Sequence, residues 1–301
     1  MKLNLAVIPA LIAATAEAHQ TLGIHGSGTT NPSKCYWHIM EQMQVQTKRP
    51  TQLTYRGVGS STGQTEFVGE DNLYVPYNDF GSGDIPLDKT RYDALQANGK
   101  EMLHLPIMFG AISFFHSVPT GDKQLNLDAC TIAKIFKRDI TDWNDPAIKN
   151  QNPGLELPNP FPITVARRVE GSSSTASITQ FLNIACENEW PADRVKKKLD
   201  DWHPDTIGCD GSGLMTNCIL ETPGTIGYID AGHGHAEGLQ EIELQNKAGN
   251  YISSKEAMEK GGIVSATLNS GMPDELDGDF SNVDLLYQVS MSHMYLSDYI
   301  S

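Results

Sequence analysis

The segment from Ile163 to Leu182 combines residue types that could bind an anion. Two adjacent arginines, Arg167 and Arg168, end a β-rich run, and Gly171 and a row of hydroxyl residues then open an apolar helical pattern. The first backbone N–H groups of a helix are unsatisfied, and the helix dipole favours negative charge at that end. The segment therefore has the chemistry of an oxyanion site, and the alternative is an ordinary helix capped by serine.

Two other glycine-rich turns precede predicted helices. Residues Gly26–Thr30 lie before a helix expected from Ser33 to about Gln44, and Arg56–Gly63 follow a predicted strand, Gln52–Tyr55. Each turn alone could be purely structural. Three Gly/Ser/Thr-rich helix starts together could surround one tetrahedral oxyanion with N–H and O–H donors. Neither turn has the spacing of a Walker P-loop or of the dinucleotide fingerprint, which argues against a nucleotide site.

Alternating elements must position these turns. Short apolar stretches, glycine-rich turns and helical segments follow one another from residue 21 to residue 84, which predicts an α/β fold with a mainly parallel sheet. In such sheets ligands collect beyond the carboxyl ends of the strands. Further helices are predicted at 129–136 and 174–184, and a buried strand at 225–229.

The length of 301 residues suggests two folding units. The apolar run Leu103–Val118 contains Pro106, which an uninterrupted strand would not carry comfortably, so we interpret it as a crossing between two lobes. The alternating segment Leu239–Leu244 is expected to be a strand that returns to the first lobe. The predicted division is a signal peptide at 1–18, a first lobe at 19–106 plus 239–301, and a second lobe at 107–238.

The N-terminus has the pattern of a secretory signal. An apolar run from Leu3 to Ala14 follows one lysine and precedes the small-residue pattern Ala16–Ala18. The run is shorter than the ~20 residues that a spanning helix needs, and Pro9 interrupts it. We therefore expect an exported protein, whether secreted, periplasmic or attached to the cell surface.

Charge and cysteine content narrow the function further. The chain has 37 acidic and 22 basic residues and no basic run beyond Lys196–Lys198, so it lacks the electrostatic footprint of a nucleic-acid binder. Five cysteines in an exported chain make disulfides plausible and leave at least one thiol over. Cys209 and Cys218 form the favoured pair because they flank a flexible Asp-Gly-Ser-Gly turn.

Metal binding and hydrolysis are weaker interpretations. His233 and His235 form a His-x-His pair without a clear third ligand, and no Cys-x-x-Cys element suggests zinc. No Gly-x-Ser-x-Gly element with a plausible histidine and aspartate order is present. We expect no catalytic residue, no metal and no cofactor.

Seven motifs in order resemble those of the PstS-type phosphate-binding proteins, and the resemblance covers almost the whole mature chain. These motifs are Gly26–Pro32, Tyr55–Ser61, Asp79–Asp84, Ile140–Pro146, Asn152–Gly154, Arg167–Ser172 and Gly224–Tyr228. The resemblance implies a two-lobed, hinged α/β fold of the type II periplasmic-binding-protein class. It also implies high-affinity binding of inorganic phosphate for uptake, with a membrane phosphate transporter as partner. The alternatives are an oxyanion sensor of the same fold and a phosphate-ester hydrolase.

The family's ligand positions correspond to eight residues here. Those expected from the first lobe are Thr30, Asn31, Ser60 and Asp84, and those from the second are Arg168, Ser172, Ser173 and Ser174. The chain departs from the family pattern at Asn31, where an aromatic residue is usual, and at Ser173 and Ser174, where Gly-Thr is usual. A short insertion also separates Gly63 from Asp79. Backbone N–H donors would survive all of these changes.

Asp84 has a chemical reason to face an anion. Phosphate keeps a proton at neutral pH and can donate a hydrogen bond to a carboxylate, whereas sulfate cannot. Alternation places Arg167 and Arg168 on opposite faces of their strand, and only the resemblance selects Arg168 as the ligand residue. Glu170 is expected to pair with one of the two guanidinium groups.

Overall fold

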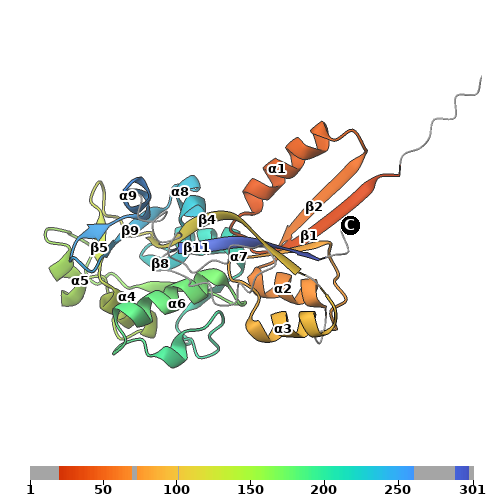
Figure 1. Cartoon of the computed structure of the whole chain (residues 1–301). Helices are drawn as coiled ribbons and strands as arrows, with labels where there is room; N and C mark the ends of the chain where they lie inside the picture. The colour runs from red at the N-terminus through yellow and green to blue at the C-terminus, as the bar shows by residue number, and fades with distance from the viewer. Residues whose placement is uncertain (1–19, 70–72, 101, 261–288, 298–301) are drawn as a thin grey trace, which may run out of the picture.

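The computed structural model describes residues 20–69, 73–100, 102–260 and 289–297, the last of these as backbone only. The predicted signal peptide at 1–18 lies outside the described residues. Strands and helices alternate along most of the chain. The strands form one mixed sheet in the order β2 (Thr51–Gly57), β1 (Leu22–Gly28), β3 (Phe80–Gly83), β11 (Val289–Ser297), β4 (Met102–His116), β8 (Thr225–Asp230), β6 (Thr164–Arg168) and β7 (Ile207–Cys209). The chain is thus an α/β protein with mixed sheets and flanking helices (Figure 1).

The N-terminal elements alternate as the sequence predicts. They are β1 (Leu22–Gly28), α1 (Ser33–Gln46), β2 (Thr51–Gly57), α2 (Ser60–Val68), β3 (Phe80–Gly83) and α3 (Lys89–Ala97). Strand β1 pairs in parallel with both β2 and β3, so the carboxyl ends of all three lie at one edge. The glycines expected to form a turn at Gly26–Gly28 instead belong to β1. They allow close packing, because a Cβ at Gly26 would collide with the ring of Phe80.

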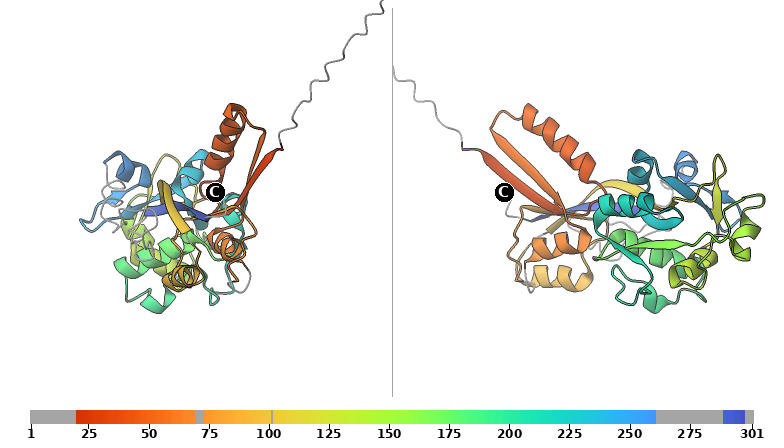
Figure 2. Two further views of the ribbon diagram at one scale, coloured as in Figure 1. Left: turned by 45° about the vertical axis from the view of Figure 1, so that its right-hand side comes forward. Right: turned by 180° about the vertical axis from the view of Figure 1, so that it is seen from behind.

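Two adjacent strands connect the N-terminal elements with the later ones (Figures 1 and 2). Strand β4 (Met102–His116) pairs with β11 (Val289–Ser297) over its first two thirds and with β8 (Thr225–Asp230) over its last residues. The crossing predicted for this region is therefore made by one long strand, although an uninterrupted strand seemed incompatible with Pro106. A register shift makes it possible, since Pro106 pairs with His293 and Met108 with Ser292, leaving Ile107 as a bulge.

The later elements surround the larger core. They are β5 (Leu125–Leu127), α4 (Ala129–Lys137), α5 (Pro146–Gln151), β6 (Thr164–Arg168), α6 (Ser173–Ala185), the 3₁₀ turn Ala192–Arg194, β7 (Ile207–Cys209), α7 (Gly211–Glu221), β8, α8 (Ala231–Ala236), β9 (Gln240–Gln245), β10 (Tyr251–Ile252) and α9 (Ser254–Glu259). Fully buried aromatic side chains, among them Trp143, Trp190, Phe136 and Tyr228, fill this core. Strands β6 and β8 run parallel, which places the end of β6 next to the crossing strands.

Strand β9 does not return to the first lobe as the sequence suggested. It pairs in parallel with β5 and antiparallel with the end of β4, and Ile242 and Leu244 are buried in the larger core. An alternating pattern predicts a half-buried strand but carries no information about which sheet receives it. The second group of elements therefore extends past residue 238, through β9, β10 and α9.

Two disulfides link elements of this second group. The predicted pair Cys209–Cys218 is present and joins the end of β7 to α7, and Cys35 is free and exposed. Cys130–Cys186, which the sequence did not single out, joins α4 to the residue after α6. Among the described residues, none of the helices is both long enough and apolar enough to cross a membrane.

Candidate functional site

The three glycine-rich junctions meet in a cleft between the two groups of elements. The N–H groups of Val58 and Gly59, after β2, both donate to the Gly28 carbonyl at the end of β1, each at 2.9 Å. Across the cleft, the carbonyl of Gly171 lies 3.6 Å from the position that a Cβ of Gly59 would take. Parallel pairing of β1 with β2 therefore brings two junctions together, and the third, after β6, faces them.

Arg168 supplies a buried cation to this cleft. Its side chain is 5% exposed, and its Nη2 points toward the turn before α2, 3.9 Å from the Cβ position of Gly59. Burial lowers the pKa of the guanidinium, and the neighbouring Tyr228, Asp210 and Asp84 act against that shift. Its Nε is buried without a hydrogen-bond partner among the described residues. Arg167 points away from the cleft and donates to Thr206 Oγ1 at 3.3 Å.

Asp84 lies at the opposite side of the site and is almost completely buried, at 1% exposure. Its Oδ2 accepts hydrogen bonds from three side chains. Thr29 donates through its hydroxyl, Asn31 through Nδ2 at 2.9 Å, and Ser173 through its hydroxyl at 2.5 Å. The last of these bonds crosses from α6 to the loop after β3, so the carboxylate connects both walls of the cleft.

Three helix N-termini line the site, and they differ in whether a side chain caps their first N–H groups. Helices α1 and α2 have no side-chain cap, whereas the Ser172 hydroxyl caps α6 by accepting from the N–H of Ser174 at 3.1 Å. Ser60, at the start of α2, is 3% exposed, and its Oγ has no hydrogen-bond partner among the described residues. Unsatisfied donors at a helix start, next to a buried guanidinium, form an environment suited to an oxyanion.

Tyr228 holds the end of β6, at Arg168, in place. Its hydroxyl accepts from the N–H of Arg168 at 3.1 Å and is bonded to Thr175 Oγ1 at 2.8 Å. Burial raises the pKa of this phenol, so it remains a neutral hydrogen-bonding group. The sequence motif Gly224–Tyr228 contains this residue, but nothing local indicated that its side chain reaches the end of β6.

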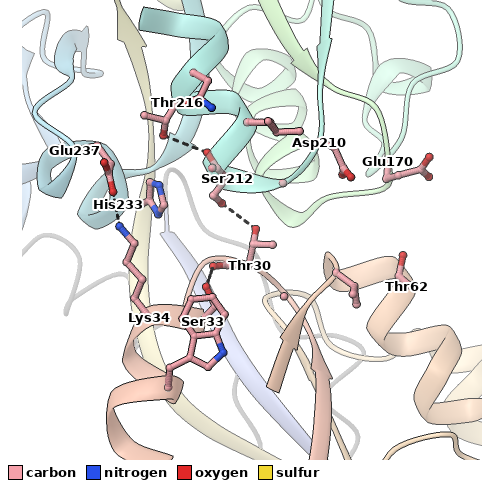
Figure 3. A pocket seen from close by; sticks show the side chains of 17 residues that line it. Thr30, Ser33, Lys34, Thr62, Glu170, Asp210, Ser212, Thr216, His233 and Glu237 are labelled. Carbon is pink, nitrogen blue, oxygen red and sulfur yellow. Dashed lines mark hydrogen bonds and ion pairs between the residues drawn. The ribbon is translucent and has the colours of Figure 1, made fainter. Parts of the chain in front are cut away.

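The eight expected site residues do not all point the same way. Asn31, Ser60, Asp84, Arg168, Ser172, Ser173 and Ser174 are gathered at the junctions just described, whereas the hydroxyl of Thr30 points outward. It is hydrogen-bonded to Ser212 Oγ of α7 at 2.8 Å (Figure 3). Its neighbour Thr29, which was not selected from the sequence, is the threonine that reaches Asp84.

A cavity of about 850 Å³ lies beyond the hydrogen bond between Thr30 and Ser212, at the mouth of the cleft (Figure 3). Its walls come from both groups of elements and include Trp37 and Lys34 of α1, Asp210 before α7, and Glu237 after α8. Lys34 and Glu237 form an ion pair across it. Glu170 also lines the cavity and pairs with Lys198 at 3.1 Å rather than with Arg167 or Arg168, which corrects the expectation for this residue.

Of the two histidines of α8, His235 contacts residues of the surrounding fold, whereas His233 lines the cavity. His235 lies 3.2 Å from Glu241 and 3.2 Å from the Ser254 hydroxyl. In the part of the chain that the structure describes, no group of three or more His, Cys, Asp or Glu side chains could hold a metal ion.

Comparisons with known proteins agree with this architecture. Residues 13–290 match the family model described as the PBP superfamily domain. The phosphate-binding protein PstS 3 of Mycobacterium leprae is 33% identical over 197 residues, which cover 65% of this chain and 50% of that protein. The phosphate-binding protein PstS of Methanocaldococcus jannaschii is 26% identical over 269 residues, 87% of this chain and 66% of that protein. The chain thus spans only half to about two thirds of the length of these relatives.

Solved structures show the same fold at low sequence identity. A phosphate ABC transporter substrate-binding protein from Clostridium perfringens, solved with bound phosphate, matches with a TM-score of 0.61 at 15% identity, over 92% of this chain and 87% of that one. A phosphate-binding protein from Stenotrophomonas maltophilia matches with a TM-score of 0.63 at 14% identity, over 91% and 78%.

Proposed function

We propose that this chain, which belongs to the PBP superfamily, binds inorganic phosphate in the cleft between its two groups of elements and serves phosphate uptake. The observation that carries the proposal is the buried guanidinium of Arg168, whose Nε has no hydrogen-bond partner among the described residues and which lies against the uncapped start of α2. A buried cation is costly, and an anion bound to it offsets that cost. The named relatives are phosphate-binding proteins, which supports phosphate as that anion.

The proposed ligand set is the one expected from the sequence. Arg168 would give charge-assisted hydrogen bonds, and the hydroxyl and N–H groups of Ser60, Ser172, Ser173 and Ser174 would surround the remaining oxygens, together with Thr30 and Asn31. Asp84 would accept the proton that phosphate retains at neutral pH. Sulfate has no such proton, so it would meet the carboxylate without a compensating hydrogen bond.

Binding would be coupled to closure about the two connecting strands. In this proposal the first lobe comprises the elements from β1 to α3, the second comprises those from β5 to α9, and β4 and β11 form the hinge. Phosphate contacts both lobes and therefore stabilises the closed form. The chain performs no chemistry on its ligand.

We further propose that the protein is exported and delivers phosphate to a membrane transporter. The signal-like N-terminus and two disulfides support an oxidising compartment. The names of the relatives support a transport role over a sensory one.

Titration calorimetry with phosphate, sulfate and arsenate tests the proposal. We expect phosphate to bind far more tightly than sulfate, and Asp84→Asn to reduce that preference because its amide no longer requires a protonated ligand. Tighter binding of sulfate than of phosphate would overturn the assignment. Turnover of a chromogenic phosphate ester that is lost in Ser172→Ala but kept in Asp84→Asn would instead favour the hydrolase.

A further inference from the structure

Helix α7 contributes no residue to the proposed ligand set, yet its first turn reaches across the cleft. Ser212 Oγ is hydrogen-bonded to Thr30 Oγ1 at 2.8 Å (Figure 3). It also donates to Asn31 Oδ1 at 3.4 Å, and both partners lie in the turn before α1. Ser212 is 2% exposed, and its partner Thr30 is half-buried at the edge of the cavity. We infer that Ser212 is a positioning residue that latches the closed cleft by holding the turn Thr30–Asn31 before α1.

The hydroxyl chemistry allows Ser212 to hold both residues of this turn. A serine hydroxyl donates one hydrogen bond and accepts up to two. Ser212 can donate its single proton to Asn31 Oδ1 and accept from the Thr30 hydroxyl. The inference rests on the proposed function, because Thr30 and Asn31 belong to the proposed ligand set.

Contacts within the second lobe hold Ser212 in place. The Thr216 hydroxyl donates to the Ser212 carbonyl at 3.2 Å, and the disulfide Cys209–Cys218 ties the residue before this turn to the second turn of α7. Gly211, with a φ of +62°, makes the sharp turn that directs α7 at Thr30. The latch therefore moves with the second lobe as a rigid part of it.

Two other contacts bridge the same cleft, but they have different properties. The ion pair Lys34–Glu237 joins side chains that are 54% and 40% exposed, and exposed pairs contribute little. The bond from Ser173 to Asp84 lies where the ligand would sit, so phosphate would compete with it. The contact between Ser212 and Thr30 is partly buried and lies outside the ligand volume, so it can persist in the liganded state.

Stopped-flow kinetics of phosphate binding to Ser212→Ala tests the inference. Loss of this hydrogen bond should weaken affinity about three- to ten-fold, and because the latch must open before phosphate can leave, the change should appear in the dissociation rate. Asn217→Ala, at an exposed position on the same helix, is the matched control and should leave both rates unchanged. An unchanged dissociation rate in Ser212→Ala, in a variant that melts like the wild type, would overturn the latch.

Small-angle scattering of the unliganded proteins separates this inference from the proposed function. We expect Ser212→Ala to have a larger radius of gyration than the wild type and Asn217→Ala, because the latch closes the cleft without ligand as well. Absence of phosphate binding by the wild type would overturn the proposed function alone. Equal radii for wild type and Ser212→Ala would overturn the latch whatever the ligand is.

Discussion

At the scale of single residues, Arg167 and Arg168 are adjacent in sequence but differ in environment. Arg168 is buried in the cleft, whereas Arg167 is bonded to Thr206 outside it. Arg168→Ala should lower phosphate affinity by about 100-fold or more, since two charge-assisted hydrogen bonds of roughly 1.5 kcal/mol each would be lost. Arg167→Ala is the matched control, and calorimetry should find its affinity within about two-fold of the wild type. Equal losses in both variants would contradict the proposed site.

Ser173 makes a hydrogen bond that the usual family residue, glycine, could not make. Its hydroxyl donates to Asp84 and so satisfies part of the carboxylate from inside the protein. Ser173→Gly should raise the preference for phosphate over sulfate, roughly ten-fold, because Asp84 would then depend more on the proton of the ligand. Competition calorimetry measures this ratio. Ser177→Gly, one turn later on α6, also replaces a buried helical serine by glycine, and a ratio that rises equally there would refute the role of Ser173.

At the scale of elements, the two disulfides should contribute differently to the free energy of unfolding. Cys130–Cys186 spans 56 residues and Cys209–Cys218 spans 9, so the entropic model gives about 4 kcal/mol for the first and about 3 kcal/mol for the second. Replacing Cys130 and Cys186 by serine should therefore lower the free energy of unfolding more, as urea denaturation would measure.

The two disulfide variants should rank in the opposite order when the rate of phosphate dissociation is measured. The Cys209–Cys218 bridge holds the first turn of α7, whereas Cys130–Cys186 lies far from the cleft, between α4 and the end of α6. Serine at positions 209 and 218 should speed phosphate dissociation, and serine at 130 and 186 should leave it nearly unchanged. Faster phosphate release only from the protein with serine at positions 130 and 186 would argue against an α7 latch.

At the scale of the whole molecule, acid should destabilise the fold through His116. Burial lowers the pKa of His116 from 6.5 to about 4, so the unfolded chain takes up a proton first and stability is lost as pH falls through this window. Between pH 7.5 and pH 4.5 the loss attributable to His116 should be about 2–3 kcal/mol. His116→Gln should remove it, as urea denaturation at both pH values would measure.

Asp230 acts in the opposite direction and sets the control for that experiment. Burial raises its pKa from 3.8 to about 6, so its protonation stabilises the fold as pH falls through the same range. The difference between His116→Gln and the wild type cancels this contribution, because both proteins contain Asp230. An identical pH dependence of the two proteins would show that His116 is not protonated on unfolding.

The sequence by itself determined the local architecture, because strands, turns and helix starts depend on neighbouring residues. The helices at α4 and α6, the strand β8 and the pair Cys209–Cys218 were predicted to within a residue or two. The three Gly/Ser/Thr-rich junctions were also evident, since parallel strands gather their carboxyl ends at one edge. The family resemblance then selected eight residues, and their role as ligands stays a prediction; the hydroxyl of one of them, Thr30, points outward to Ser212.

Only the tertiary structure decided what depends on contacts between distant residues. The sheet that receives β9, the bond of Glu170 to Lys198, and the bridge Cys130–Cys186 each join segments whose own patterns allow several partners. The same holds for Ser212, which lies 182 positions from Thr30 and has no local sign of a role in the cleft. Such pairings are set by how the chain crosses between the two halves, and that crossing depends on β4 and β11 lying side by side.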